Sequence, residues 1–311
     1  MAVSCILYDA AGHDQKCDLR TIDVSKLTSE QLLWVDVSGA AATEIKTLPK
    51  PLREAARAAQ QGAQLRIFDE FYRFSLPLFE QPGKFLTFIV GKTWVLTIAD
   101  QRESYFDEFV ESDRGETLKG RLSATAFMAA LLMRHYDAFR DLVLNIDRSI
   151  DKLEDSILRS REKRPPLNTL AELRRRVGDL RAVLSEQRAV VRGLTTPDFQ
   201  AHVDESDRDF LADVDRAFER AEEDVVRARE TVLGSFDLYA TRVAQDTNSL
   251  LKALTIITVI TGLVGAVAGI FGMNFDTPIP HSGLFGFLIV DAAMFFASAA
   301  IVGVALWRRW F

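Results

Sequence analysis

The residue types that could do chemistry gather near the C-terminus, where an apolar span ends on an uncharged amide. Residues 253–272 carry no charged side chain, and Met273 and Asn274 follow Gly272 directly. A helix of about 20 such residues crosses the ~30 Å hydrocarbon core of a bilayer. Asn is common at helix C-caps, so one expectation for Asn274 is that it closes the helix.

A second apolar span covers residues 283–307 and contains Asp291 as its only charged residue. A carboxylate inside a membrane is costly and by default marks a functional site. The alternative is that Asp291 hydrogen-bonds a Thr or Ser of a neighbouring helix. The residues alone favour this alternative.

Cys5, His13 and Cys17 form a second set of potential ligands near the N-terminus. Their spacing matches no zinc template, so we expect ordinary thiols in a reducing compartment rather than a metal site or a disulfide framework. The first ten residues, MAVSCILYDA, lack the positive region and long apolar core of a signal peptide.

Charge is distributed unevenly along the 311 residues. Residues 1–250 have the composition of a soluble, charged protein, whereas the chain from Ala253 is almost uncharged until Arg308. The net charge of −6 and the pI of about 5.4 argue against nucleic-acid binding, which requires a basic surface. The sequence predicts an α+β membrane protein with a large aqueous domain.

The N-terminal segment alternates short β-rich runs with turn residues. Residues 5–10, 32–38 and 71–79 predict strands, and residues 51–61 predict a helix. Residues 85–100 predict a hairpin around Gly91-Lys92. Because this segment contains no phosphate-binding glycine loop and no catalytic triad, we expect an α/β domain without enzymatic activity.

From Thr125 onward the apolar period becomes helical. A first helix ends before Pro165-Pro166, and a second runs through residues 170–184 and closes near 195–197. A third begins near Asp207 and continues without proline into the first apolar span, for roughly 65 residues or about 100 Å. A helix this long with a narrow apolar stripe needs partner helices, as in a coiled-coil stalk.

These patterns predict three domains. The first is an α/β domain (1–120), and the second is a helical bundle with a stalk (121–252). The third is a transmembrane domain (253–311), in which two spans (253–272 and 283–307) are joined by a short loop (273–282).

Basic residues orient the two spans. Lys252 precedes the first span and Arg308-Arg309 follow the second, whereas the connecting loop has no Lys or Arg. By the positive-inside rule both termini are cytoplasmic, in the inner (plasma) membrane, and the loop faces outside. Trp307 and Trp310 bracket the basic pair as interfacial anchors.

The first span is richer in small residues than a simple anchor. Gly262, Gly265 and Gly269 recur at helical spacing, after Thr255 and Thr258. Such a stripe is typical of close helix–helix contact, and symmetric packing of one such helix per subunit would also form a central pore. Both possibilities stay open on spacing alone.

The Gly272-Met273-Asn274 tripeptide stands at the end of the penultimate span, before a short loop, a final span and a basic-aromatic tail. In this position it resembles the GMN motif of the CorA family of divalent-cation transporters. The resemblance covers residues 205–311 well and the hairpin at 85–100 more loosely. It extends to three stalk motifs: Asp237-Leu-Tyr, Thr247-Asn248 and Leu254-Thr255-Ile-Ile.

The resemblance implies a homopentamer with a cytoplasmic funnel, a pore-lining first span and a second span outside it. It implies that Gly272, Met273 and Asn274 form the selectivity filter for Mg²⁺. Mg²⁺ gives up its water reluctantly, so a ring of neutral carboxamide oxygens suits a hydrated ion, whereas carboxylates would hold it too tightly. No resident cofactor is implied.

The resemblance also assigns the pore lining. The implied positions are Asn248, Leu251, Leu254, Thr258, Gly262 and Gly265. Leu251 and Leu254 would form a hydrophobic gate with Asn248 as a polar ring below it. The family often has bulkier residues than Gly262 and Gly265, so we expect a wider middle of the pore and no gate there.

Two aspartates on the stalk are candidate regulatory metal ligands. Asp213 matches the stalk position of a regulatory Mg²⁺ site in magnesium-selective members, with a solvated helix-face charge as the alternative. Asp237, near the membrane, is a better candidate for concentrating cations at the pore mouth.

The main alternative within the family is a Zn²⁺ transporter of the ZntB type, coupled to protons. This alternative is motivated by the outer loop, which contains His281 and, with Asp276 as its single acid, is poorer in acids than in typical magnesium members. It is also motivated by Asp291, a carboxylate that could titrate within the second span. A membrane-anchored coiled-coil scaffold without conduction is the alternative from another class. It would need neither the glycine-lined span nor the GMN motif.

Overall fold

A computed structural model describes most of the chain. The described residues are 2–11, 14–19, 22–39, 48–57, 63–79, 81–111, 122–159, 167–273 and 283–307. The chain divides into two compact units, one of residues 1–155 with 162–234 and one of residues 156–161 with 235–311.

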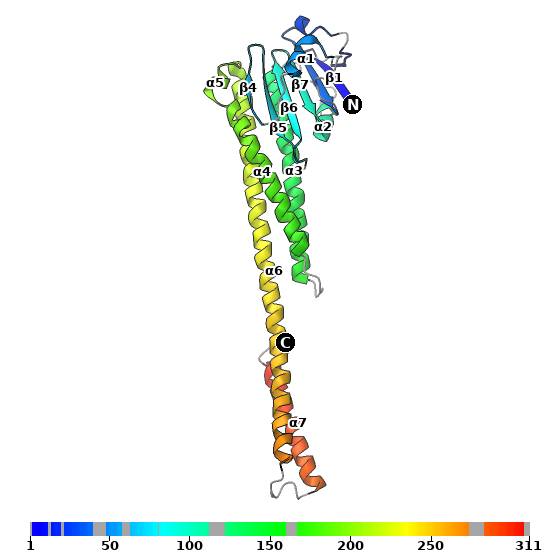
Figure 1. Ribbon diagram of the computed structural model, residues 1–311, viewed down its shortest axis with the longest axis vertical. Coiled ribbons are helices and arrows are strands. Elements are labelled where there is room, and N and C mark those ends of the chain that lie inside the picture. The colour runs from blue at the N-terminus through cyan, green and yellow to red at the C-terminus, as the bar shows by residue number, and fades with distance from the viewer. Residues whose placement is uncertain are drawn as a thin grey trace. The chain divides into compact units, whose positions relative to one another are not determined.

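The first unit contains a seven-stranded sheet of order β2-β1-β3-β7-β6-β5-β4 (Figure 1). Its strands are β1 (Ala2–Asp9), β2 (Gln15–Lys16), β3 (Gln31–Ser38), β4 (Arg66–Ile67), β5 (Phe71–Pro77), β6 (Phe85–Gly91) and β7 (Trp94–Ala99). Strands β3 and β7 pair in parallel, and the other described pairs are antiparallel. The predicted strands and the β6–β7 hairpin are confirmed.

The two faces of the sheet pack against different helices because side chains alternate along each strand. On one face, Val35 belongs to a buried core that includes Leu52 of α1 (Lys50–Arg57). On the other face, Trp34 contacts Phe106 of α2 (Ser104–Glu111), with ring centroids 5.4 Å apart, and Phe127 at 5.7 Å. Helix α2 is the main element that the sequence patterns did not predict.

Three long helices continue the first unit. They are α3 (Ala124–Arg159), α4 (Leu167–Leu194) and the N-terminal part of α6 (Arg208–Phe271); short elements are α5 (Pro197–Gln200) and the 3-10 turns η1 (Val24–Lys26) and η4 (Glu205–Asp207). Buried side chains recur every three or four residues along α4, as a heptad-like stripe requires. Arg188 pairs with Glu222, which joins α4 to α6, and Arg140 Nε lies 3.2 Å from Asp224 Oδ2, which joins α3 to α6.

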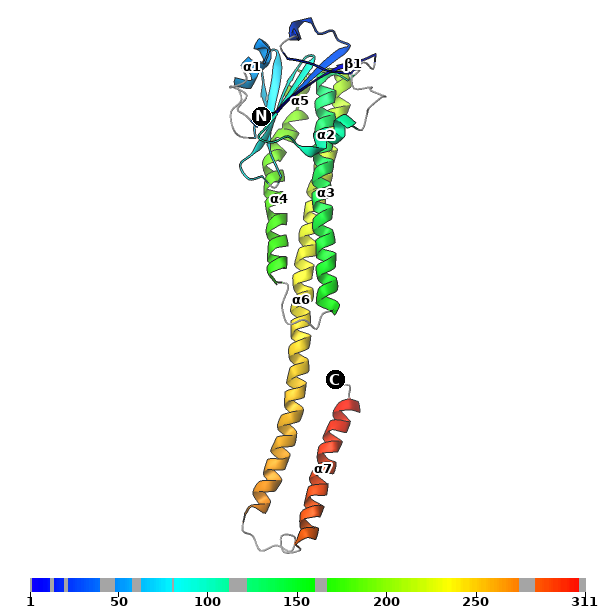
Figure 2. The same cartoon turned by 90° about the vertical axis from the view of Figure 1, so that its right-hand side faces the viewer.

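The second unit contains the C-terminal part of α6 and helix α7 (Leu284–Trp307) (Figure 2). Helix α6 is continuous for 64 residues, which confirms the predicted uninterrupted helix. Among the described residues, α6 and α7 are the two helices long and apolar enough to cross a membrane.

The expectation of two separate thiols is wrong. Cys5 and Cys17 are joined in a disulfide, with their Cα atoms 5.3 Å apart. The reason is local: β1 pairs antiparallel with β2, and the Cys17 N–H donates to the Cys5 carbonyl oxygen at 3.0 Å. That register places the two side chains side by side, although their spacing in sequence suggests nothing of the kind.

Candidate ion pathway

The C-terminal end of α6 closes at the glycine and methionine of the GMN motif. The Gly272 N–H donates to the Ala268 carbonyl at 2.9 Å, and the Met273 N–H donates to the Ile270 carbonyl at 3.3 Å. The Met273 side chain is 55% exposed. Asn274 lies outside the described residues, as do Asp276 and His281.

One face of the span in α6 is covered by α7. Ile256 is buried, and the residues that follow it at helical spacing, Ile260, Leu263 and Val267, are half-buried. A groove of about 440 Å³ between the helices is lined by Thr255, Ile256, Val259, Ala300, Ile301, Val304 and Ala305. The two spans therefore pack antiparallel along this face.

The opposite face of α6 carries the residues that the resemblance assigns to the pore. Asn248, Leu251, Leu254, Thr258, Gly262 and Gly265 are all exposed. At about 100° per residue, their mean direction is roughly 180° from that of the stripe facing α7. Within the second unit, all six residues of the predicted pore stripe are exposed, and most of them lie on the side of α6 that points away from α7.

The hydroxyl groups of two threonines on this helix form hydrogen bonds within the helix itself. Thr255 Oγ1 donates to the Leu251 carbonyl and Thr258 Oγ1 to the Leu254 carbonyl, both at 2.8 Å. Such bonds let a hydroxyl reside in an apolar span without a partner from another helix. A Cβ added at Gly262 or Gly265 would have nothing within 4 Å, so this face of the helix is open as well as uncovered.

The two candidate regulatory aspartates have different surroundings. In the first unit, Asp213 is half-exposed and forms an ion pair with Arg216, one turn further along α6. In the second unit, Asp237 is exposed. Among the described residues of the single chain, no three His, Cys, Asp or Glu side chains are close enough together to form a metal site.

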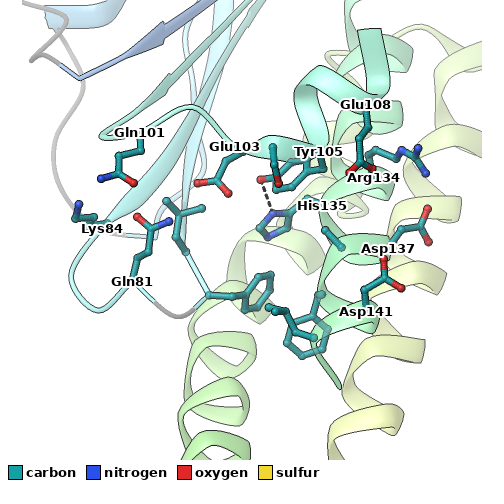
Figure 3. A pocket seen from close by; sticks show the side chains of 16 residues that line it. Gln81, Lys84, Gln101, Glu103, Tyr105, Glu108, Arg134, His135, Asp137 and Asp141 are labelled. Atoms are coloured by element: carbon teal, nitrogen blue, oxygen red, sulfur yellow. Dashed lines mark hydrogen bonds between the residues drawn. The ribbon is translucent and has the colours of Figure 1, made fainter. Parts of the chain in front are cut away.

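A cavity of about 640 Å³ in the first unit is the other candidate site (Figure 3). Acidic side chains dominate its charged lining: Glu103, Glu108, Asp137 and Asp141, against Lys84 and Arg134. Burial raises the pKa of the Glu103 carboxyl, and the nearby Asp36 carboxylate raises it further. Sequence reasoning missed this cavity, because its residues come from segments far apart in the chain.

His135 lines the cavity, and Figure 3 shows its hydrogen bond with Tyr105. Its Nδ1 is 2.9 Å from the Tyr105 hydroxyl and its Nε2 is 3.3 Å from Gln187 Nε2. Gln187 Nε2 also donates to the Pro77 carbonyl at 2.7 Å, and Gln187 Oε1 accepts from the Tyr136 hydroxyl. Since Gln187 Nε2 can only donate, His135 Nε2 accepts and the proton resides on Nδ1.

Burial lowers the pKa of His135 to about 3, so the ring is neutral at physiological pH. A ring that is buried, neutral and bonded on both sides holds β5, α2, α3 and α4 together. It is therefore a structural centre of the first unit rather than a general base.

The first unit contains a mixed α/β sheet, and the 64-residue helix α6 and helix α7 are each long and apolar enough to cross a membrane. These features are those of a membrane protein with a large polar part. A profile of the family described as CorA-like Mg2+ transporter protein matches residues 29–309. The chain therefore belongs to the CorA family, and the expectation of a divalent-cation transporter rather than an enzyme is confirmed.

Individual relatives agree with this assignment. The cobalt/magnesium transport protein CorA of Thermotoga maritima is 25% identical over 324 residues, covering 94% of this chain and 88% of that protein. The structure of the CorA magnesium transporter from Methanocaldococcus jannaschii superposes with a TM-score of 0.70 at 18% identity, covering 98% of both chains. The full-length CmaX protein gives a TM-score of 0.68 at 19% identity, covering 96% of this chain and 97% of that one.

Proposed function

We propose that the protein takes up Mg²⁺ through a homopentameric pore lined by the uncovered face of α6. The observation that carries the proposal is the separation of two stripes on one helix. Ile256 and its neighbours face α7, whereas the stripe from Asn248 to Gly265 is exposed on the opposite side. A cyclic ring of copies would bury that stripe around a central axis, with α7 outside.

Asn274 is the proposed ion-selecting residue. Helix α6 ends at Phe271 and closes through Gly272 and Met273, and the proposal assigns the residue that follows them to the outer mouth of the ring. Five carboxamide oxygens there would accept hydrogen bonds from the waters of a hydrated Mg²⁺. This binds the ion without the cost of stripping its shell.

Leu251 and Leu254 form the proposed gate. Their side chains are 56% and 58% exposed in a single copy, so they are available for contact with the equivalent residues of other copies. A ring of leucines excludes water from a narrow pore and so blocks a hydrated ion. Asn248 gives a polar ring next to this barrier, and the glycines Gly262 and Gly265 leave the middle of the pore wide.

The orientation and regulation follow from charge. Lys252 at the start of the first span supports a cytoplasmic location for both termini, in the inner membrane. Exposed Asp237 would concentrate cations at the inner mouth. A regulatory Mg²⁺ at Asp213 would have to displace Arg216, so Asp213 is the weaker of the two candidate sites.

The test is Mg²⁺ flux into liposomes that contain the purified protein and a trapped Mg²⁺ indicator. We expect Asn274→Ala to abolish flux while the oligomer survives size-exclusion chromatography. Asn145→Ala, the same change at an exposed position on α3, should conduct like the parent. Full flux by Asn274→Ala would refute the filter assignment. Flux of Zn²⁺ instead of Mg²⁺, stimulated by a pH gradient, would replace Mg²⁺ by Zn²⁺ as the cargo.

A further inference from the structure

The depth of Asp291 follows from the packing of α7 on α6. Ile256 and Val304 line the same groove, so they lie at the same level of the antiparallel pair. Gly269 is 13 residues after Ile256, and Asp291 is 13 residues before Val304. Because both helices rise by the same amount per residue, Asp291 is level with Gly269, in the last turns of α6.

Asp291 is also close to the outer end of its own helix. Helix α7 begins at Leu284, seven residues earlier, which corresponds to about 10 Å. The carboxylate therefore lies in the outer third of a hydrocarbon core of about 30 Å. The Asp291 side chain is exposed on the flank of α7, beside the stripe that faces α6.

Apart from Asp291, the described spans contain no polar side chain at this level. From Leu263 to Met273, α6 carries apolar residues and glycine, and the nearest hydroxyl below that stretch is Thr261. Thr261 lies eight residues from Gly269 along α6, or about 12 Å lower. In α7 the nearest is Ser298, seven residues from Asp291 and about 10 Å away along the helix.

Neighbouring copies cannot supply a threonine or serine from these spans either. Cyclic symmetry about the membrane normal keeps every residue at the same depth in every copy. Thr261 of a second copy would thus be as far below Asp291 as Thr261 of the same copy. Hydrogen bonding to a span hydroxyl, the alternative that the sequence favours, does not fit this geometry.

We propose that Asp291 is a hydrated carboxylate, open to the outer aqueous phase, whose charge attracts cations to the outer end of α6. Charge beside a low-dielectric wall focuses the field and raises the local concentration of the counter-ion. One such charge per copy, level with the last turns of the pore helix, increases the rate at which cations enter. The role in flux rests on the proposed function, whereas hydration and local potential do not.

The first experiment measures hydration and potential without any transport. Leu288, one turn outward from Asp291 and 53% exposed, is changed to Cys, and proteoliposomes are treated with membrane-impermeant cationic or anionic methanethiosulfonates. We expect Leu288→Cys to react, and adding Asp291→Asn to lower the cationic-to-anionic rate ratio about tenfold. The parent chain, in which Cys5 and Cys17 are joined in a disulfide, gives the background.

Phe295→Cys, one turn deeper than Asp291, is the matched control and should be nearly unreactive. A Leu288→Cys that resists both reagents would overturn the hydration of this site. An unchanged rate ratio in the Asp291→Asn background would overturn the electrostatic role. Both outcomes are informative even for a protein that carries no Mg²⁺.

The second experiment measures Mg²⁺ influx at sub-saturating Mg²⁺ in low and high concentrations of N-methylglucamine chloride. We expect Asp291→Asn to slow influx about tenfold at about 10 mM ionic strength and less than about twofold at about 0.5 M, because the screening length shrinks several-fold. Asp291→Glu should retain parental influx. A defect of Asp291→Asn that is equal at both ionic strengths would show a packing role and contradict the proposal.

Discussion

The buried imidazole of His135 makes the stability of the first unit depend on pH. Burial lowers its pKa from 6.5 to about 3 in the folded protein, whereas in the unfolded chain it titrates at its ordinary value. Between these pKa values the unfolded state binds more protons, so the free energy of unfolding rises with pH there. His135 thus contributes fully above about pH 6.5, and its contribution is lost progressively as pH falls toward 3.

The size of the effect follows from the two pKa values. A pH of 5 is about 1.5 units below the pKa of the imidazole in the unfolded chain, so there this imidazole is almost fully protonated. The folded imidazole is still neutral. At 1.36 kcal/mol per unit, lowering the pH from 7.5 to 5 should cost about 2 kcal/mol of unfolding free energy.

The measurement is pulse proteolysis of the full chain in detergent across a urea series, at several pH values. His135→Gln is the reference, because its amide can still bond Tyr105 and Gln187 but does not titrate. Burial raises the pKa of the Asp36, Glu103 and Asp207 carboxyls, so these groups make the free energy of unfolding rise as the pH falls, which is opposite to the effect of His135. Because both proteins contain these carboxyls, their effect cancels when the two pH curves are subtracted. Parallel pH curves for the parent and His135→Gln would refute the assignment of a neutral buried histidine.

Two further predictions concern packing in the same unit. A Cβ at Gly91 would lie 2.2 Å from Trp94 Cε2, so Gly91→Ala should lower the free energy of unfolding by about 2 kcal/mol. Gly178 on α4 has open space around it, so the control Gly178→Ala should leave the free energy of unfolding unchanged or raise it by up to about 1 kcal/mol. Equal urea midpoints for the two variants would contradict this prediction. Arg102 Nη1 lies 3.0 Å from Asp36 Oδ2, and the Asp36 side chain is 3% exposed. Arg102→Met leaves that buried carboxylate without its counter-charge and should cost about 3 kcal/mol, and a loss below about 1 kcal/mol in the same assay would show that Asp36 needs no ion pair.

Local patterns were sufficient where one segment determines its own structure. The β6–β7 hairpin was predicted from two β-branched runs around Gly91-Lys92, and the continuous α6 from the absence of any helix-ending residue between Asp207 and Gly272. Contacts between distant segments left no such signal. Tyr105 and His135 are 30 residues apart, and Gln187 bonds a carbonyl 110 residues away. His135 and Gln187 only interrupt otherwise apolar stripes.

The disulfide between Cys5 and Cys17 shows that the pairing register of two strands can override a prediction made from the number and spacing of cysteines. The presence of only two cysteines predicts free thiols, and β2 is too short, at two residues, for its pairing to be seen in the sequence. Once Ile6 pairs with Lys16, the antiparallel ladder brings Cys17 beside Cys5. Pairing geometry, not composition, decides whether the two sulfur atoms meet.

The pore assignment depends on a distinction that hydropathy cannot make. Every face of the first span is apolar or small, so its average character predicts only that it crosses a membrane. The position of α7 breaks this symmetry, because it covers Ile256 and leaves Leu251 and Leu254 uncovered. A lipid-facing stripe would favour large side chains throughout, whereas this one contains Asn248, Gly262 and Gly265. Small and polar residues on an uncovered face are suited to contact with other copies of the same helix, and that contact is what a pore requires.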